Sequence, residues 1–253
     1  MIRFFADLQD IDSFAGCIRL SREDADHIHS LRLRPDEHFI VCNGHGIDYT
    51  CKLGQREDVT VAKIVGQNRS RGEPTVKCSV YIAYQKGDRL DYAVQKAVEL
   101  GVYEIILFES KRCVAVPGDV QKKTARLQRI ALETAKLSGR GRIPSVTSGG
   151  MFKEIIKNAA NHSSLLLFFY ENESDLHIKG ILDQHFQPGN DFTDEKQNSV
   201  SVVTGPEGGF EPHEAEMARA EGFNIVSLGP RILRSETAPA AALAAIMYQS
   251  GNF

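Results

Sequence analysis

The chain has 253 residues, 42% of them hydrophobic and 25% charged, which is usual for a globular protein of one large or two smaller domains. Its five scattered cysteines form no C-x-x-C pair, which argues against a zinc ribbon or a disulfide framework and favours a reduced, cytoplasmic protein. The first residues lack the apolar core of a signal peptide, and no apolar run approaches the roughly 20 residues of a membrane span. A net charge of −3 does not indicate a nucleic-acid binder.

Residues 1–72 are predicted to form a small β-barrel, because short apolar segments alternate there with turn signals such as Asn43-Gly44. The expected strands lie at 3–6, 16–21, 38–44, 47–55 and 58–66. Residues 21–33 are expected to be helical, with Ser21 as N-cap and Asp24 in an acidic variant of the capping box. A polar, turn-prone linker ends the region.

Residues 73–253 change to an alternation of strands and helices, which predicts an open α/β sheet. The expected strands are 76–85, 103–110, 164–170, 199–205 and 224–229, and the expected helices are 88–101, 120–139, 214–223 and 238–249. Several of these strands are continuously apolar, which is typical of a parallel sheet covered on both faces. Residues 184–198 are expected to be a surface loop.

Two glycine-rich loops are expected at the carboxyl ends of neighbouring strands, where open α/β sheets bind ligands. They are TGPEGGF at 204–210 and LGPRILRSETAP at 228–239, and neither is a phosphate-binding P-loop. A carboxylate inside the first loop would repel phosphate, so a ligand with a cationic centre and a neutral ribose fits better. The alternative is that both loops are ordinary turns.

These loops, together with several upstream segments, resemble the RsmE family of bacterial 16S ribosomal RNA methyltransferases in the knotted SPOUT superfamily. The carboxyl-terminal match is GPEGGF, EAEMARAEGF and VSLGPRILRSETA. Further matches are GDRLDYAVQKAVELGV, SKRC and SGRGRIP and, near the amino terminus, RFF, HIHSLRLRPDE and NGHGIDYTCKL. The resemblance therefore extends over nearly the whole chain.

The resemblance implies a PUA-like β-barrel over residues 1–72 that contacts RNA, followed by a SPOUT methyltransferase domain over residues 73–253 that contains a trefoil knot. It implies S-adenosylmethionine as cofactor and methylation of a specific uridine at N3 in 16S rRNA of the small ribosomal subunit. It also implies a homodimer whose cofactor pockets lie close to the subunit interface. No metal is expected, because the eight histidines show no ligand spacing.

The resemblance assigns three loops to the cofactor. Within them, Gly205 and Gly208 are expected to let the backbone approach the adenine and ribose, and Leu228, Ile232 and Leu233 to bury the adenine. The expected cofactor-binding residues are Phe169, Tyr170, Glu171, Thr204, Gly205, Pro206, Glu207, Gly208, Gly209, Ser227, Leu228, Gly229, Ile232 and Leu233.

The expected catalytic residues are Arg234, Glu236 and Arg3. Arg234 is expected to stabilise the uridine anion. Glu236 is a candidate for the general base, for orienting Arg234 or for capping the last helix. The expected RNA-binding residues are Arg3, Arg32, Arg34, Lys86, Arg140 and Arg142.

The chain departs from the family at Lys136 and Leu137, where members usually have Glu-Gln, and Lys86 stands where many have arginine. A non-catalytic protein that binds RNA and S-adenosylmethionine in ribosome assembly is one alternative function. A SPOUT methyltransferase with another RNA target is a second. An enzyme dependent on nucleotide or NAD is disfavoured by the missing phosphate loop.

Overall fold

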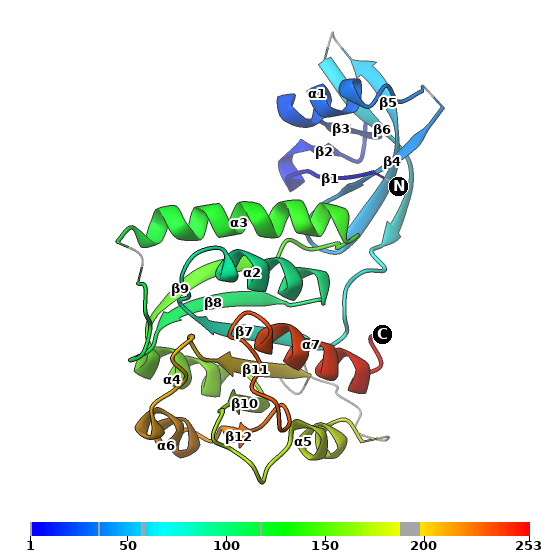
Figure 1. Cartoon of the computed structure of the whole chain (residues 1–253). Helices are drawn as coiled ribbons and strands as arrows, with labels where there is room; N and C mark the ends of the chain where they lie inside the picture. The colour runs from blue at the N-terminus through cyan, green and yellow to red at the C-terminus, as the bar shows by residue number, and fades with distance from the viewer. Residues whose placement is uncertain (1, 35, 57–58, 117, 188–197) are drawn as a thin grey trace. The chain divides into compact units, whose positions relative to one another are not determined.

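The computed structural model describes residues 2–34, 36–56, 59–116, 118–187 and 198–253 (Figure 1). The chain divides into two compact units. Unit 1 contains Met1–Glu73 and Leu132–Ile143, and unit 2 contains Pro74–Ala131 and Pro144–Phe253. The segment Leu132–Ile143, which the sequence analysis placed in the second domain, groups with the first unit. The domain boundary at residues 72 and 73 stays a prediction.

Unit 1 is built on one six-stranded sheet in the order β1-β4-β5-β6-β3-β2. Its elements are β1 (Arg3–Phe5), a 3-10 turn (Leu8–Asp10), β2 (Ile11–Asp12), β3 (Cys17–Arg19), α1 (Arg22–Ser30), β4 (His38–Cys42), β5 (Ile47–Arg56) and β6 (Val59–Arg69). β1 and β4 are parallel, and the other paired strands are antiparallel. Inward-facing side chains such as Phe4, Ile18 and Phe39 form one core with Ile28 of α1.

Helix α1 begins where the sequence predicts, because Ser21 Oγ accepts a hydrogen bond from the Asp24 N–H at 3.0 Å. Ser21 is therefore confirmed as the N-cap. The helix ends at Ser30, earlier than the predicted end at residue 33. Arg32 follows with a φ of 50°, a left-handed conformation that a helix cannot contain.

Unit 1 includes the loop at residues 138–143, because the Glu73 carboxylate binds it. Arg140 donates to Glu73 through Nε and Nη2 at 2.8 and 2.9 Å, and the N–H groups of Gly141 and Arg142 donate to Oε1 at 2.8 and 3.1 Å. On the strand side, the Gly46 N–H donates to the Gly141 carbonyl at 2.9 Å. The Glu73 carboxylate and the hydrogen bond from Gly46 to Gly141 therefore both hold this loop in unit 1.

A second buried ion pair joins β1 to β5. Arg3 donates to both carboxylate oxygens of Asp48 at 2.6 Å, and the two side chains are only 10% and 14% exposed. Ser70 Oγ also donates to Asp48, at 2.5 Å. Arg3 is thus part of the framework of unit 1.

Unit 2 is built on a six-stranded sheet in the order β12-β10-β11-β7-β8-β9, and every pair in it is parallel. The strands are β7 (Lys77–Ala83), β8 (Glu104–Glu109), β9 (Ser145–Met151), β10 (Leu165–Phe169), β11 (Ser199–Thr204) and β12 (Asn224–Val226). The predicted open parallel α/β sheet is confirmed. Strand β9 was not predicted, because its sequence SVTSGGM is polar and it lies at the edge of the sheet.

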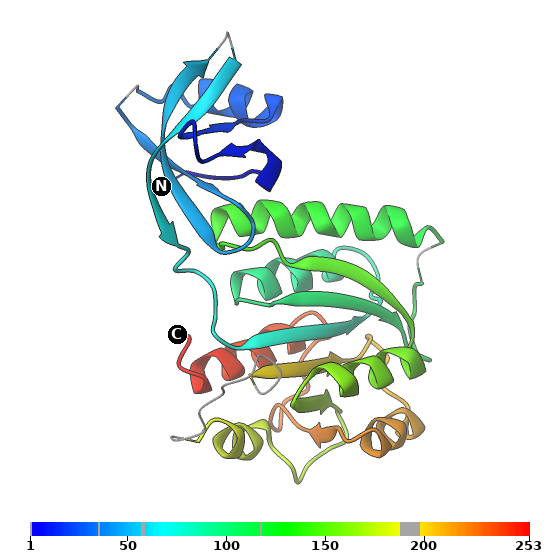
Figure 2. The same cartoon turned by 180° about the vertical axis from the view of Figure 1, so that it is seen from behind.

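Helices cover both faces of this sheet (Figures 1 and 2). They are α2 (Arg89–Glu99), α3 (Val120–Leu137), α4 (Phe152–His162), α5 (Ile178–His185), α6 (Pro212–Ala220) and α7 (Ala238–Gln249). α7 contacts α2 and α5 on one face, whereas α4 contacts α6 on the other. The sequence analysis did not predict α4 and α5. The buried side chains of α4, Phe152, Ile155 and Ile156, join Phe168 and Phe210 in one core cluster.

The strand order places β10 between β11 and β12, so three strands far apart in sequence end side by side. Their loops therefore emerge at one edge of the sheet. The trefoil knot stays a prediction. Among the described residues, no helix is long and apolar enough to cross a membrane.

Replacing Asp48 with asparagine is expected to destabilise the protein by about 1.5–3 kcal/mol near neutral pH, because Arg3 stays buried without an opposite charge. Burial alone would raise the pKa of Asp48, but the hydrogen bonds from Arg3 and Ser70 and the Arg3 charge outweigh it, and the pKa lies below its ordinary value of 3.8. The pair therefore stabilises fully above that ordinary pKa and loses its effect as pH falls through the lowered one.

Thermal unfolding near neutral pH and at about pH 3 measures this effect, and the difference between the two proteins should shrink in acid. Asp10→Asn is the control, because its partner Arg19 is 68% exposed and such a pair contributes about 1 kcal/mol or less. Equal losses from both variants, or a loss at Asp48 that does not depend on pH, would contradict the prediction.

Candidate functional site

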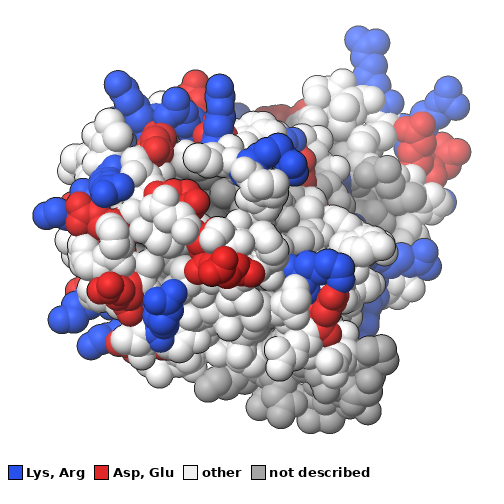
Figure 3. Space-filling view, turned by 60° about the horizontal axis from the view of Figure 1, so that its bottom comes forward, with Lys and Arg blue, Asp and Glu red and all other residues white. Residues whose placement is uncertain are grey.

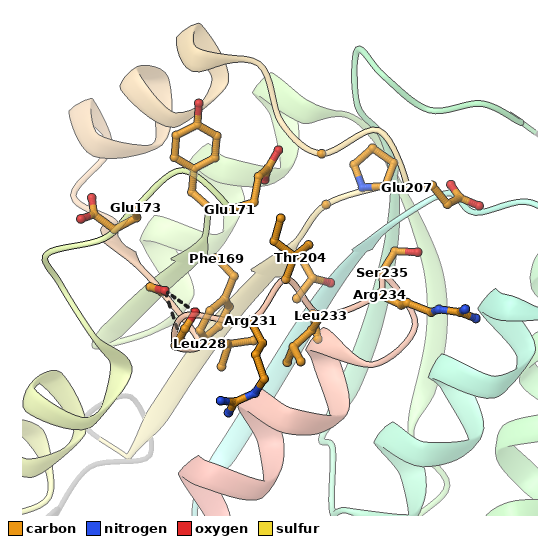
Figure 4. Close-up of a pocket in the computed structure, with 18 of the residues that line it drawn as sticks. Phe169, Glu171, Glu173, Thr204, Glu207, Leu228, Arg231, Leu233, Arg234 and Ser235 are labelled. Atoms are coloured by element: carbon orange, nitrogen blue, oxygen red, sulfur yellow. Dashed lines mark hydrogen bonds between the residues drawn. The ribbon is translucent and has the colours of Figure 1, made fainter.

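A cavity of about 750 Å³ opens at the carboxyl ends of β10, β11 and β12 (Figure 4). The last residues of these strands, Phe169, Thr204 and Val226, all line it. So does every residue that the sequence analysis expects to bind the cofactor, and so do Arg234 and Glu236. The structure therefore brings together in one cavity the three loops that the sequence singled out.

The three glycines of the TGPEGGF loop each lie close to a neighbouring side chain. A Cβ on Gly205 would lie 3.0 Å from the Phe210 ring, and one on Gly208 would lie 3.0 Å from the Arg112 Cβ. Gly209 has a φ of +68°, and a Cβ there would lie 1.7 Å from the Glu171 carboxylate. Neighbouring side chains thus also limit the space at Gly205 and Gly208, and the approach of a ligand to their backbone stays a prediction.

The third loop is held at both ends. Ser227 Oγ exchanges hydrogen bonds with the Gly229 backbone, drawn as dashed lines in Figure 4, at 3.1 and 3.2 Å. Further along, Gln85 Nε2 donates to the Ser235 carbonyl at 3.1 Å. The Arg234 carbonyl accepts from the Thr237 N–H at 2.9 Å, which begins the turn into α7. This anchoring fixes the backbone that carries Arg234 and Glu236.

The apolar side chains of this loop differ in burial. Leu228 and Leu233 are partly buried, whereas Ile232 lines the cavity but is 86% exposed. Leu228 and Leu233 therefore lie where they could form a wall for an adenine ring, and their contact with the adenine stays a prediction. Ile232 stands out into solvent, at the rim.

Glu207 connects the first loop to the start of α2. Its Oε1 accepts from the Lys86 backbone N–H and from Arg89 Nη1, both at 2.8 Å. Oε2 is buried and has no hydrogen-bond partner among the described residues. Burial alone would raise the pKa of Glu207, but these hydrogen bonds, the one from its own N–H and the Arg89 charge lower it overall, so the carboxylate is ionised at neutral pH.

Arg89 is a site residue that sequence reasoning missed. It lines the cavity and lies between Glu207 at 2.8 Å and Glu236, whose Oε2 is 4.0 Å from Arg89 Nε. It is also the first residue of α2, where the helix dipole disfavours a cation. A basic residue at a helix start beside a ligand loop was the available signal, in the segment GDRLDY.

Arg234 and Glu236 lie together at the edge of the cavity. Arg234 is 82% exposed and its Nη1 is 3.8 Å from Oε1 of Glu236, which is 14% exposed. Thr237 is the N-cap of α7, and Ser235 Oγ donates to Glu236 at 3.3 Å. The structure therefore gives the cap position to Thr237 and corrects the expectation that Glu236 caps this helix. Arg231 points away from Arg234 in Figure 4.

The expected RNA-binding residues differ in accessibility. Arg32, Arg34 and Lys86 are exposed, and Arg142 is half-buried. Arg140 is 2% exposed and bidentate on Glu73, and Arg3 is bidentate on Asp48 in unit 1. For Arg140 and Arg3 the placement corrects the expectation of a phosphate contact, because each guanidinium is buried and already paired.

The departure from the family at Lys136 and Leu137 also has a structural setting in unit 1. Lys136 Nζ lies 3.6 Å from Asp24 and 3.5 Å from Glu133, and Leu137 is 88% exposed. The lysine thus replaces a polar group by an ion pair to α1. Nothing in the structure explains the exposed leucine. Among the described residues there is no cluster of His, Cys, Asp and Glu that could hold a metal.

Comparison with known proteins identifies two domains. The RNA methyltransferase domain family matches residues 72–247, and the RNA methyltransferase PUA domain family matches residues 20–63. The chain is 32% identical to the ribosomal RNA small subunit methyltransferase E of Mesomycoplasma hyopneumoniae over 94% of this chain and 95% of that protein. It is 30% identical to the protein of that name from Bacillus subtilis over 99% and 97% of the two chains.

Solved structures have the same architecture. A ribosomal RNA small subunit methyltransferase E from Neisseria gonorrhoeae, bound to S-adenosylmethionine, superposes with a TM-score of 0.81 at 29% identity over 98% and 97% of the two chains. A putative methyltransferase from Legionella pneumophila, also with bound S-adenosylmethionine, gives 0.80 at 26% identity over 98% and 97%. Fold and cavity together define an RNA methyltransferase domain joined to a PUA domain. The chain belongs to the ribosomal RNA small subunit methyltransferase E (RsmE) family.

Gly209→Ala is expected to destabilise the protein by at least about 1 kcal/mol, because the left-handed φ and the Glu171 carboxylate both oppose a Cβ. Gly180→Ala is the matched control. Gly180 lies inside α5 with nothing within 4 Å of an added Cβ, so alanine should stabilise by about 0.5–1 kcal/mol. Chemical denaturation measures the change in the free energy of unfolding, which should have opposite signs in the two variants. An unchanged free energy of unfolding in Gly209→Ala would refute the packing argument.

Proposed function

We propose that this protein transfers a methyl group from S-adenosylmethionine to N3 of a uridine in the 16S rRNA of the small ribosomal subunit. The observation that carries the proposal is the cavity at the ends of β10, β11 and β12, which collects all the residues that the RsmE resemblance assigns to the cofactor. Membership in a family whose members are named for methylation of small-subunit rRNA supports the substrate. Two relatives with this fold were crystallised with S-adenosylmethionine bound.

The residues of the cavity fit this cofactor. Four carboxylates stand against three guanidinium groups in its lining, an excess of negative charge that favours a cationic ligand. The apolar Leu228 and Leu233 suit an adenine ring. The Glu207 Oε2, buried without a partner among the described residues, needs a hydrogen-bond donor, and a ribose hydroxyl or an ammonium supplies one. When bound, S-adenosylmethionine supplies a methyl group on a positively charged sulfur.

The chain's own residues assist the acceptor. Uridine N3 carries a proton that must pass to water before the ring nitrogen can attack, so negative charge develops on the uracil ring. That charge is consumed when the new N–C bond replaces the S–C bond of the sulfonium. The guanidinium of Arg234 is 82% exposed at the cavity edge and is placed to stabilise that charge. Glu236 lies within 4.0 Å of both Arg89 and Arg234. A carboxylate between two guanidinium groups is placed to orient Arg234.

The proposal includes a homodimer and, as its RNA partner, the small ribosomal subunit, as the family resemblance implies. It also includes a cytoplasmic location, where small ribosomal subunits are methylated. The face drawn in Figure 3 has Lys and Arg side chains interspersed with Asp and Glu. RNA contact through this face would therefore depend on individual cations, since the described residues on it form no continuous basic patch.

Transfer of labelled methyl groups to small subunits that lack the modification tests the reaction directly. Nucleosides are then released by digestion and identified. Label in 3-methyluridine is the expected result. If the protein binds S-adenosylmethionine by calorimetry but labels no RNA, the methyltransferase proposal is wrong and a non-catalytic binder replaces it. Label in another nucleoside indicates a different target.

Arg234→Ala is expected to lower kcat for this transfer by about 100-fold or more, while the dissociation constant of S-adenosylmethionine changes little. Arg231→Ala removes the same charge from the same loop on a side chain that points elsewhere, and it is expected to lose far less activity. Calorimetry and initial rates on small subunits separate the two effects. Similar losses of kcat in both variants would show that the general positive charge of the loop, and no specific role of Arg234, supports catalysis.

A further inference from the structure

A second hollow of about 700 Å³ adjoins the cavity on the side of α2. Its lining is Lys86, Asp88, Arg89, Tyr92, Arg234, Glu236 and Thr237. Three of these residues, Arg89, Arg234 and Glu236, also line the first cavity. The two spaces therefore meet at the residues to which the proposed chemistry is assigned.

We propose that this second hollow receives the target nucleotide and that the ring of Tyr92 is the surface on which the uracil base stacks. This inference rests on the proposed function and adds to it the acceptor side of the site. A base can be methylated on its ring nitrogen only after it has left its neighbours in the RNA, and proteins hold such bases by stacking them on aromatic side chains.

The placement of Tyr92 suits this role. Arg89 and Tyr92 are three residues apart on α2, so their side chains share one face of the helix. Tyr92 is 47% exposed. The Nζ of Lys96 lies over the ring, 5.7 Å from its centroid, and is also paired with Glu99 at 2.8 Å. The hollow thus offers an exposed aromatic ring in a lining that contains three cations and the two carboxylates of Asp88 and Glu236.

The charges around the ring match a nucleotide. Lys86 is exposed and can contact a phosphate, while its backbone N–H is held by Glu207. Arg234 lies in both linings, so a base on Tyr92 would have its developing negative charge next to that guanidinium. A uracil is also small enough for a hollow of this size.

Arg89 links the donor cavity to the acceptor hollow as a positioning residue. Its guanidinium lies 2.8 Å from Glu207, in the cofactor loop, and 4.0 Å from Glu236, in the catalytic loop. The same residue begins the helix that carries Tyr92. The methyl donor and the stacked base are thereby held in a fixed position relative to each other, which an in-line transfer requires.

Kinetics of methyl transfer to unmodified small subunits by the full chain tests the subsite. Tyr92→Ala is expected to lower kcat/KM by roughly 5- to 150-fold, the range observed when a base-stacking ring is removed. Tyr92→Phe keeps the stacking surface and is expected to retain most of kcat/KM. The dissociation constant of S-adenosylmethionine should stay the same in both, because Tyr92 does not line the first cavity.

Tyr103→Ala is the matched control. Tyr103 also has a lysine over its ring, Lys77 Nζ at 5.1 Å, but it precedes β8 and so lies at the amino end of a strand, opposite to the carboxyl ends where the cavity opens. Normal kcat/KM in Tyr92→Ala, a loss that Tyr103→Ala matches, or an equal loss in Tyr92→Phe would overturn the stacking role while leaving the proposed function intact. Weaker binding of S-adenosylmethionine in Tyr92→Ala would overturn it too. No transfer by the unaltered chain would instead refute the proposed function, and the subsite with it.

Discussion

The site depends on the hydrogen bonds that the carboxylate of Glu207 accepts. One of its oxygens accepts from the Lys86 backbone and from Arg89, so it ties the loop after β11 to the start of α2. Because Arg89 also approaches Glu236, the loop before α7 belongs to the same group. Charged hydrogen bonds, which are stronger than neutral ones, thus join the first two segments, and an ion pair at 4.0 Å brings in the third.

The parallel sheet brings the loops close enough together for these bonds to form. Strands β10, β11 and β12 lie side by side and end together, so their loops meet without help from the rest of the chain. Close contacts then restrict each loop to one shape. Gly205 packs against Phe210, which belongs to the aromatic cluster under α4, and Gly209 leaves room for Glu171. The rigidity of the site therefore derives from the core of unit 2.

The sequence was informative where one residue type has one physical meaning. Continuous apolar strands predicted a buried parallel sheet, and Ser21 predicted a helix start. It failed where the meaning depends on a distant partner. Arg140 and Arg3 appear as available cations in the sequence, yet Glu73 and Asp48 bury them, and those carboxylates lie 67 and 45 residues away. Arg89 had a weak signal in the sequence, a cation at a helix start, but its contacts with Glu207 and Glu236 are what place it in the site.

The distribution of charge also explains how one site can serve two ligands of opposite sign. S-adenosylmethionine is cationic at sulfur, and RNA is a polyanion, so a site of uniform charge would repel one of them. Here Glu171 and Glu173 line only the first cavity, whereas Lys86 lines only the second. Arg89, Arg234 and Glu236 lie in both linings, where the transferred methyl group would pass. The first cavity is therefore the more acidic side and favours the cationic donor. In the second, Asp88 offsets Lys86, so the positive charge available to RNA comes from Arg89 and Arg234, which both linings share.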